Sequence, residues 1–258
     1  MNVLQNLIEL YDHLSLDSTY RSVVKKILLN LPEAAEATVY ELADLTESSR
    51  TTIWRMLQML GYERFTDFHY ALKQAVKHYS YYNRIIPSSR MHEEEDIIEE
   101  IQKSLKKAVV GSRIDLNADK LCKLAKRVYE SDAIYFFFPY RTPAINSFQQ
   151  NLAIVGKETN ILCLYPDMLT CAETMVENSL VLCMTIEHAE TMDMTGIFER
   201  LEEHKAYTVL FTGGESKYDE YVKELVCAEP KNTSAFESIT RFEAFMFALS
   251  EIFRKMYI

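Results

Sequence analysis

The stretch from Thr38 to Ala71 reads TVYELADLTESSRTTIWRMLQMLGYERFTDFHYA, and it determines how the N-terminal part of the chain folds. Thr38 followed three residues later by Glu41 is the pattern of a capping box, in which side chain and backbone satisfy each other at the start of a helix. This pattern predicts a short helix over Val39–Leu45. Residues 46–48 then form a turn.

After the turn, Ser48 or Ser49 caps a second helix, which Gly61 ends. Ile53 and Met56 take its inward positions. Its outward side carries hydroxyl and guanidinium groups, on Ser49, Arg50, Thr51, Thr52 and Arg55. Two short helices joined in this way have helix–turn–helix form, in which the second helix brings such groups to bases and phosphates in the major groove. The spacing alone fits an ordinary three-helix bundle with a solvated polar face equally well.

The rest of the first 78 residues is also predicted to be helical. Apolar residues at helical spacing predict a helix near residues 4–14 and another over 18–30, which Pro32 stops. A last helix is predicted from about Thr66 to Lys77. We therefore expect residues 1–78 to form one all-helical domain.

A second domain is predicted over residues 97–258. Residues 79–96 predict a linker, because a Pro-Ser-Ser break is followed by a run of acidic residues. Beyond two amphipathic helices at 97–110 and 118–129, short apolar runs alternate with helical stretches. The runs are Ala133–Phe138, Asn160–Leu164, Ser179–Ile186, Thr208–Thr212 and Glu224–Ala228, and a long helix over Ser234–Met256 follows. Unbroken apolar strands separated by helices indicate a parallel sheet covered on both faces.

The composition is that of a globular protein. The chain has 258 residues, of which 48% are hydrophobic and 26% charged, which predicts one or two folded domains and excludes wholesale disorder. No apolar run approaches the roughly 18 residues of a membrane-spanning helix. The start of the chain has no basic region, so we expect no signal peptide. Five cysteines without a CxxC pair predict reduced, buried thiols and a cytoplasmic location.

The charge is distributed unevenly along the chain. The net charge is −10, yet residues 1–90 hold ten basic and ten acidic residues and are neutral. Within residues 48–90, seven basic residues face only two acidic ones, so this stretch is about +5. A small basic module is therefore joined to an acidic body, and we expect the acidic body not to contact nucleic acid.

The stretch quoted above resembles the N-terminal domain of RpiR-type bacterial transcription regulators. The matching elements are the E-L-A of Glu41–Ala43, the S-x-x-T-I-x-R of Ser49–Arg55 and the L-G-[YF]-x-x-F-x-x-F of Leu60–Phe68. The resemblance implies a cytoplasmic regulator of carbohydrate metabolism genes that binds a double-stranded DNA operator. One departure lies at the turn, where the family usually has Gly-Val and this chain has Glu47-Ser48. We expect strain at Glu47, and its charge lies near the DNA.

RpiR-type regulators join this domain to a sugar isomerase (SIS) domain, so the resemblance implies a doubly wound, five-stranded parallel sheet for about residues 105–258. SIS domains bind phosphosugars with a Gly/Ser loop after the first strand and an S-x-S-G-x-T loop after a later one. Small residues there let backbone N–H groups and hydroxyls close around a phosphate. This chain has neither loop, because no Gly follows the first strand at 139–143 and acidic residues follow the third at 185–191.

A small-molecule effector pocket is expected at the carboxyl ends of the first and third strands, where open parallel sheets bind ligands. Its expected lining is Tyr140, Arg141, Thr142, Thr185, Glu187, His188 and Thr191, with Glu237 approaching from a partner subunit. The mixed charges fit a neutral or amino-bearing sugar, or a sugar phosphate held mainly by Arg141. A domain that binds no ligand and serves only to dimerise is the remaining alternative.

Catalysis is not expected. Adjacent Glu187 and His188 do not form a catalytic pair by themselves, and no metal-binding spacing such as HExxH or CxxC occurs, so we expect no cofactor. The competing interpretation is a sugar-phosphate isomerase-like enzyme with an accessory helical domain, against which the missing loops argue. We expect a homodimer or tetramer formed through residues after 97. The final helix carries more phenylalanines than one core-facing stripe needs.

Overall fold

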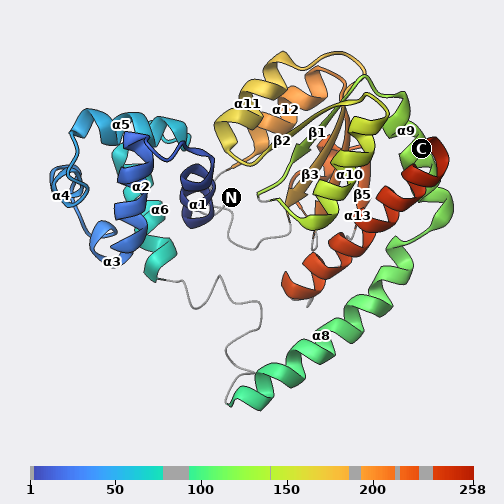
Figure 1. Cartoon of the computed structure of the whole chain (residues 1–258), viewed down its shortest axis with the longest axis horizontal. Helices are drawn as coiled ribbons and strands as arrows, with labels where there is room; N and C mark the ends of the chain where they lie inside the picture. The colour runs from blue at the N-terminus through green and yellow to red at the C-terminus, as the bar shows by residue number, and fades with distance from the viewer. Residues whose placement is uncertain (1–2, 78–92, 140, 186–192, 213–215, 227–234) are drawn as a thin grey trace.

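The computed structural model of the chain describes residues 3–77, 93–139, 141–185, 193–212, 216–226 and 235–258. A helical part at the N-terminus lies beside an α/β part that contains the C-terminus (Figure 1). The predicted linker over 79–96 lies mostly outside the described residues. None of the helices in the described ranges is both long and apolar enough to cross a membrane.

The helical part has six helices in its described residues, and they share one apolar core. They are α1 (Val3–His13), α2 (Thr19–Leu29), α3 (Leu31–Ala34), α4 (Val39–Leu45), α5 (Arg50–Met59) and α6 (Phe65–Lys77). Their fully buried side chains include Leu7, Val24, Leu42, Ile53 and Phe68. Each helix therefore contributes one apolar face, as the spacing of its residues predicts.

Local capping explains where two of these helices begin. Both bonds of the predicted capping box are present: the Thr38 N–H donates to Glu41 Oε2 at 2.7 Å, and the Glu41 N–H donates to Thr38 Oγ1 at 3.3 Å. Helix α4 accordingly has the bounds that the sequence predicts. The helix expected to stop at Pro32 ends at Leu29, and Pro32 lies in the first turn of α3. A proline suits that position, because its fixed φ matches the helix and its missing N–H has no helical partner there.

The α/β part has a five-stranded sheet with strand order β2-β1-β3-β4-β5, and all four pairings are parallel. In chain order its elements are α8 (Glu94–Asp115), α9 (Ala118–Glu130), β1 (Ala133–Phe137), α10 (Pro143–Ile154), β2 (Glu158–Leu162), α11 (Tyr165–Thr174), β3 (Leu180–Thr185), α12 (Thr195–Glu203), β4 (Tyr207–Thr212), β5 (Glu224–Val226) and α13 (Ala235–Tyr257). The predicted doubly wound, five-stranded parallel sheet is confirmed. The strand order reverses between β1 and β3, which is where such sheets bind ligands.

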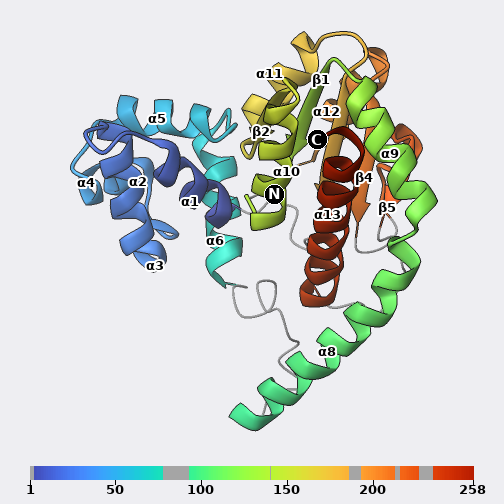
Figure 2. The same cartoon turned by 45° about the vertical axis from the view of Figure 1, so that its right-hand side comes forward.

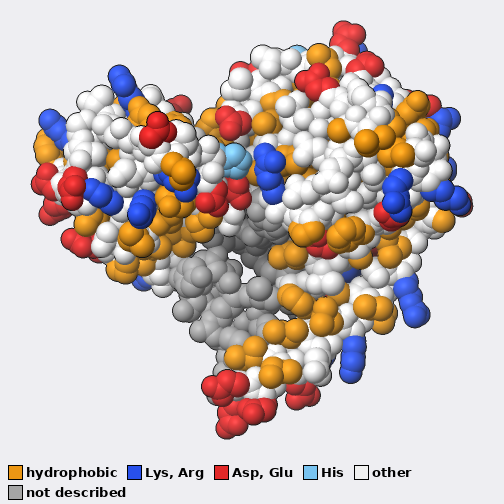
Figure 3. All heavy atoms as spheres, viewed as in Figure 1, with side chains coloured by type: hydrophobic (Ala, Val, Ile, Leu, Met, Phe, Trp, Pro, Cys, Tyr) orange, Lys and Arg blue, Asp and Glu red, His pale blue; other side chains and the backbone are white. Residues whose placement is uncertain are grey.

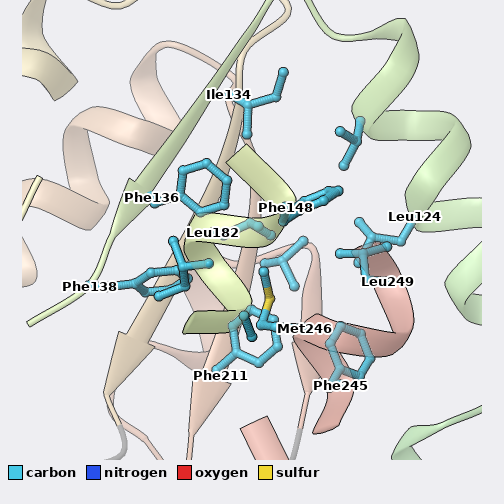
Figure 4. Close-up of a cluster of buried hydrophobic side chains, with 14 of the residues drawn as sticks. Leu124, Ile134, Phe136, Phe138, Phe148, Leu182, Phe211, Phe245, Met246 and Leu249 are labelled. Atoms are coloured by element: carbon cyan, nitrogen blue, oxygen red, sulfur yellow. The ribbon is translucent and has the colours of Figure 1, made fainter. Parts of the chain in front are cut away.

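Helices bury both faces of this sheet. Along β1, Ile134 and Phe136 join the cluster shared with α9, α10 and α13, whereas Tyr135 and Phe137 join the cluster shared with α11 and α12. Aromatic rings fill the first cluster (Figure 4), where Phe136 and Phe148 meet edge to face with centroids 6.1 Å apart. Burial on both faces explains why the strands are continuous apolar runs.

A buried ion pair joins α8 to α13. The Arg241 guanidinium donates to Asp115 through Nε at 2.8 Å and through Nη2 at 3.1 Å, and the two side chains are 1% and 6% exposed. Gly111 of α8 makes room for this contact, because a Cβ there would lie 3.1 Å from the Arg241 side chain. Removing one partner of such a pair typically costs about 3–5 kcal/mol, since the other charge is left buried and alone. The pair therefore fixes the C-terminal half of α8 on the domain.

The phenylalanines of α13 do not leave the excess apolar surface that the sequence suggests. Phe242, Phe245 and Phe253, together with Leu249, are buried in the chain's own core, because α8, α9, α10 and the sheet surround this helix (Figure 2). Among the described aromatic residues of α13, only Phe247 is exposed, at 44%. The expectation that α13 carries more phenylalanines than its core-facing side can bury is therefore wrong.

Candidate DNA-binding surface and candidate effector site

Helix α5 presents a polar N-terminal end to solvent. Ser49 precedes the helix and caps it, because its Oγ accepts the Thr52 N–H at 3.1 Å. Ile53, Met56 and Leu57 bury the opposite side of the helix. Of the predicted DNA-contacting residues, four are exposed and one is half-buried: Ser49, Arg50, Thr51 and Arg55 are exposed, and Thr52 is half-buried. Ser49 to Thr52 thus lie at the start of α5, and Arg55 lies in the middle of the helix.

Arg50 is held by a residue that the sequence reasoning missed. Its Nη1 donates to the Tyr40 hydroxyl at 2.9 Å, and its guanidinium carbon lies 4.5 Å from the centre of the Tyr40 ring. Tyr40 belongs to α4 and is 61% exposed, so the pair lies on the surface between the two helices. A planar guanidinium stacks on an aromatic face in this way, and its remaining donors keep their fork geometry. Nothing in the local pattern of α4 indicates this contact, because it joins positions ten apart.

The turn between α4 and α5 is a Schellman motif with an unusual residue. The Glu47 N–H donates to the Asp44 carbonyl at 3.0 Å and the Ser48 N–H donates to the Ala43 carbonyl at 2.8 Å, the two bonds that define the motif. Glu47 has φ of 51°, in the left-handed region that favours glycine. The strain expected at Glu47 is therefore present in the structure.

An ion pair compensates the charge of Glu47. Lys26 Nζ of α2 lies 2.8 Å from Glu47 Oε2, although the Glu47 side chain is 82% exposed. The bond from Lys26 holds the pKa of the Glu47 carboxyl below its usual value, so this group is ionised at neutral pH. The charge of Lys26 is consequently balanced by the Glu47 carboxylate of the same domain, and not left to pair with a DNA phosphate.

The expected effector pocket lies only partly within the described residues. The carboxyl ends of β1 and β3 are neighbours, since Phe137 pairs with Cys183 in the parallel register. Four of the eight residues expected around this edge fall outside the described part of the chain: Tyr140, Glu187, His188 and Thr191. The others are Arg141, Thr142, Thr185 and Glu237.

Three of these four residues lie at the ends of the elements that frame the edge. Thr142 is buried, and its Oγ1 accepts the Ile145 N–H at 3.4 Å as the cap of α10. Thr185 ends β3, and its buried Oγ1 has no hydrogen-bond partner among the described residues. Glu237 is half-buried in the first turn of α13. A buried hydroxyl without a partner is costly, which makes Thr185 the best marker of a ligand position at this edge.

Arg141, the fourth residue, is exposed and precedes the Thr142 cap of α10. Cys163, just after β2, is buried, at 4% exposed. Burial raises the pKa of this thiol to about 12, so at neutral pH the group stays protonated and is not a nucleophile.

An acidic residue that the sequence does not single out, Asp193, lies just before the helix after β3. Asp193 Oδ1 accepts the Thr195 N–H at 2.9 Å and the Thr195 hydroxyl at 2.6 Å, and Lys217 Nζ lies 2.9 Å away. These bonds lower the pKa of the Asp193 carboxyl, and the bond from the Thr195 hydroxyl has the largest effect. A carboxylate thus occupies the N-terminus of α12, a position that otherwise attracts a phosphate. The signal was the Asp-x-Thr spacing, which is typical of a side-chain cap.

No group of three or more His, Cys, Asp or Glu side chains among the described residues is arranged to hold a metal ion. The described groups at the sheet edge are hydroxyls, one guanidinium, one protonated thiol and carboxylates. Such a set binds polar ligands through hydrogen bonds and charge.

Comparison with known proteins places the first domain in a family. Residues 1–78 match the model of the helix-turn-helix domain of the rpiR family. No curated protein sequence matches the chain.

Two solved structures are similar to the chain as a whole or in part. The NanR protein of Vibrio vulnificus, solved in complex with ManNAc-6P, is 18% identical with a TM-score of 0.50, and the match covers 99% of this chain and 93% of NanR. A Methanococcus jannaschii protein, for which a function as 3-hexulose-6-phosphate isomerase was inferred, is 13% identical with a TM-score of 0.42 over 62% of this chain and 92% of that one. The first likeness shows a shared fold, and the second is too weak to bear on function. Residues 1–78 thus form a helix-turn-helix domain of the rpiR family, and the chain joins this domain to a doubly wound α/β domain.

Proposed function

We propose that this protein is a DNA-binding transcriptional regulator, with residues 1–78 as its DNA-binding domain and residues 97–258 as its sensor domain. The observation that carries the proposal is the rpiR-family helix–turn–helix domain, whose α5 exposes the polar end that a recognition helix needs. In this arrangement Arg50 and Thr51 contact base edges. Arg55, farther along the helix, contacts phosphates.

We further propose that the sensor domain binds a small sugar derivative at the carboxyl ends of β1 and β3. The Thr185 hydroxyl at the end of β3, which has no partner among the described residues, supports this position, and Arg141 lies between β1 and α10. NanR was solved with a sugar phosphate, which makes that class one candidate. Asp193 at the N-terminus of α12 opposes a phosphate there, so a neutral or amino-bearing sugar, or a phosphate held by Arg141, fits the described charges better.

Self-association through α8 is the third part of the proposal. Helix α8 extends away from the sheet, and hydrophobic side chains lie along it (Figures 1 and 3). Ile98, Leu105 and Val109 lie on one side of α8 and are 58%, 40% and 60% exposed. Two copies that bury this side against each other would form a two-fold dimer and hold two DNA-binding domains at a fixed spacing. Sedimentation of the full chain at micromolar concentration measures this state.

Arg55→Ala should weaken binding to DNA of any sequence and make it less dependent on salt. Each phosphate contact releases counterions, so the slope of log K against log salt concentration should fall by about 1. Fluorescence anisotropy with a labelled duplex at several salt concentrations measures both quantities. Lys126→Ala, which removes an exposed charge from α9, is the matched control. Unchanged binding of the Arg55 variant at both low and high salt would contradict this role.

Glu47→Gly and Glu47→Gln should both raise DNA affinity severalfold at low salt. Both remove a negative charge near the phosphates and free Lys26 to approach them. The two variants differ in backbone strain, because only glycine adopts the left-handed conformation without cost. Thermal unfolding should therefore show a higher midpoint for Glu47→Gly than for Glu47→Gln. Equal affinities of the wild type and Glu47→Gln would show that the charge of Glu47 does not reach the DNA.

Thr185→Val should abolish or weaken effector binding without weakening the fold. Thermal unfolding in the presence of neutral, amino-bearing and phosphorylated sugars, ManNAc-6P among them, identifies a binder. At 100 times its Kd a ligand should stabilise the wild type by ~2.7 kcal/mol. Thr208→Val removes another buried hydroxyl without a described partner, at the start of β4, and serves as the control. If no sugar shifts the wild-type midpoint, the domain has no effector of this class and only dimerises.

A further inference from the structure

A cavity lies beside β5, the last strand of the sheet, which β4 separates from β3. Figure 2 shows β5 between α13 and the corner at which α8 meets α9. These four elements line a cavity of about 490 Å³, which is within the size range of small-molecule sites. We call it the β5 pocket. Its described lining includes none of the residues expected around the effector edge, so the two places are separate.

Much of the lining of the β5 pocket is apolar. Leu124 of α9 and Phe245 of α13 line it and are almost fully buried, at 2% and 4% exposed. Ile114 of α8 and Leu225 of β5 also line it, but they are 63% and 43% exposed. An apolar group that fills the cavity would remove these two side chains from water, which is favourable. The pocket therefore suits a molecule with an apolar body.

The buried ion pair of α8 and α13 forms a polar part of the same lining. Arg241 and Asp115 both line the β5 pocket, and the guanidinium donates two hydrogen bonds to the carboxylate. Their charges compensate each other within the protein. The pair consequently gives the pocket a fixed polar wall without adding net charge, and it holds the last turn of α8 at the cavity.

The remaining charged side chains of the lining give the pocket a positive excess. Lys120 and Lys123 lie three positions apart on α9, so they share one face of this helix. Both are exposed, and neither forms an ion pair with a carboxylate of the described residues. Glu224 of β5 is the one other charged residue of the lining, and it accepts the Tyr207 hydroxyl. Two ammonium groups thus face one carboxylate, an arrangement that attracts a single negative charge.

We propose that the β5 pocket is a second ligand site, which binds a small monoanion with an apolar body, such as an aromatic carboxylate. The carboxylate of the ligand lies at Lys120 and Lys123, and its apolar body packs against Leu124 and Phe245. The site is independent of the proposed effector edge and of the DNA-binding surface. Because Asp115 belongs to the last turn of α8, a bound molecule contacts the helix through which we expect two copies to associate.

The first test compares 2-naphthoate with the neutral 2-naphthamide, which has nearly the same shape, by equilibrium dialysis against the full chain. The wild type should bind the carboxylate about tenfold more tightly, because an exposed ion pair contributes up to about 1 kcal/mol and two lysines take part. The double variant Lys120→Gln/Lys123→Gln should bind both molecules equally. Lys126→Gln, which removes another exposed charge of α9 from outside the lining, is the matched control and should behave as the wild type.

Three results would overturn the proposal. The first is equal binding of 2-naphthoate and 2-naphthamide to the wild type. The second is a loss of 2-naphthoate affinity in Lys126→Gln as large as in the double variant, since the attraction would then come from the overall charge of α9. The third is no binding of 2-naphthoate at millimolar concentration.

A second pair of variants tests the apolar part of the site. Leu225→Ala should weaken the binding of 2-naphthoate and of 2-naphthamide by a similar factor, because it removes an apolar wall and no charge. Val176→Ala, which shortens an exposed apolar side chain outside the lining, should leave both affinities unchanged. Because Leu225 is exposed, its replacement should not disturb the core, and the thermal midpoint without ligand checks this. Unchanged affinities in Leu225→Ala would place the ligand elsewhere and contradict the proposed site.

Discussion

The parallel sheet is buried on both faces, and this constraint determines where the α/β domain can carry chemistry. Helices α9, α10 and α13 cover one face and α11 and α12 the other, so the three central strands β1, β3 and β4 carry mostly apolar side chains along their length. Polar groups are left to the loops at the carboxyl edge, where Arg141, Thr185 and Asp193 gather. The same edge receives α1 of the DNA-binding domain, which shares an apolar cluster with Leu164 after β2. A single physical requirement, burial of the sheet, thus leaves the polar groups and the interdomain contact at the same edge.

In the helical domain, local capping determines where helices α4 and α5 begin. The capping box of α4 and the Ser49 cap of α5 satisfy backbone donors at each start, and the Schellman turn joins the two helices. Glu47 is strained in this turn, because its φ lies in the left-handed region that favours glycine, and Lys26 offsets its charge. The turn that joins α4 to α5 is therefore strained and ion-paired, where the family usually has glycine.

Sequence patterns predict this molecule well where the cause is local or periodic. The capping box gives α4 its bounds, and apolar runs give all five strands. Sequence patterns predict less well where a feature depends on residues distant in the chain or on the position of a strand in the sheet. Strand β2 (Glu158–Leu162) begins two residues before the predicted run, because it is an edge strand with exposed and half-buried positions. The role of Tyr40 depends on Arg50 of another helix, which no spacing reveals. For α13, the number of phenylalanines does not reveal that α8, α9 and α10 pack around this helix and bury most of them.

The central claim is that the exposed end of α5 reads DNA sequence. The most direct measurement is to sequence the genomic fragments that the purified full chain retains, beside those retained by Arg50→Ala. The account predicts a shared motif with two half-sites for the wild type, and loss of preference at one base pair of each half-site for the variant, at about 1–3 kcal/mol. Retention of the same fragments by both proteins without any common motif would contradict it.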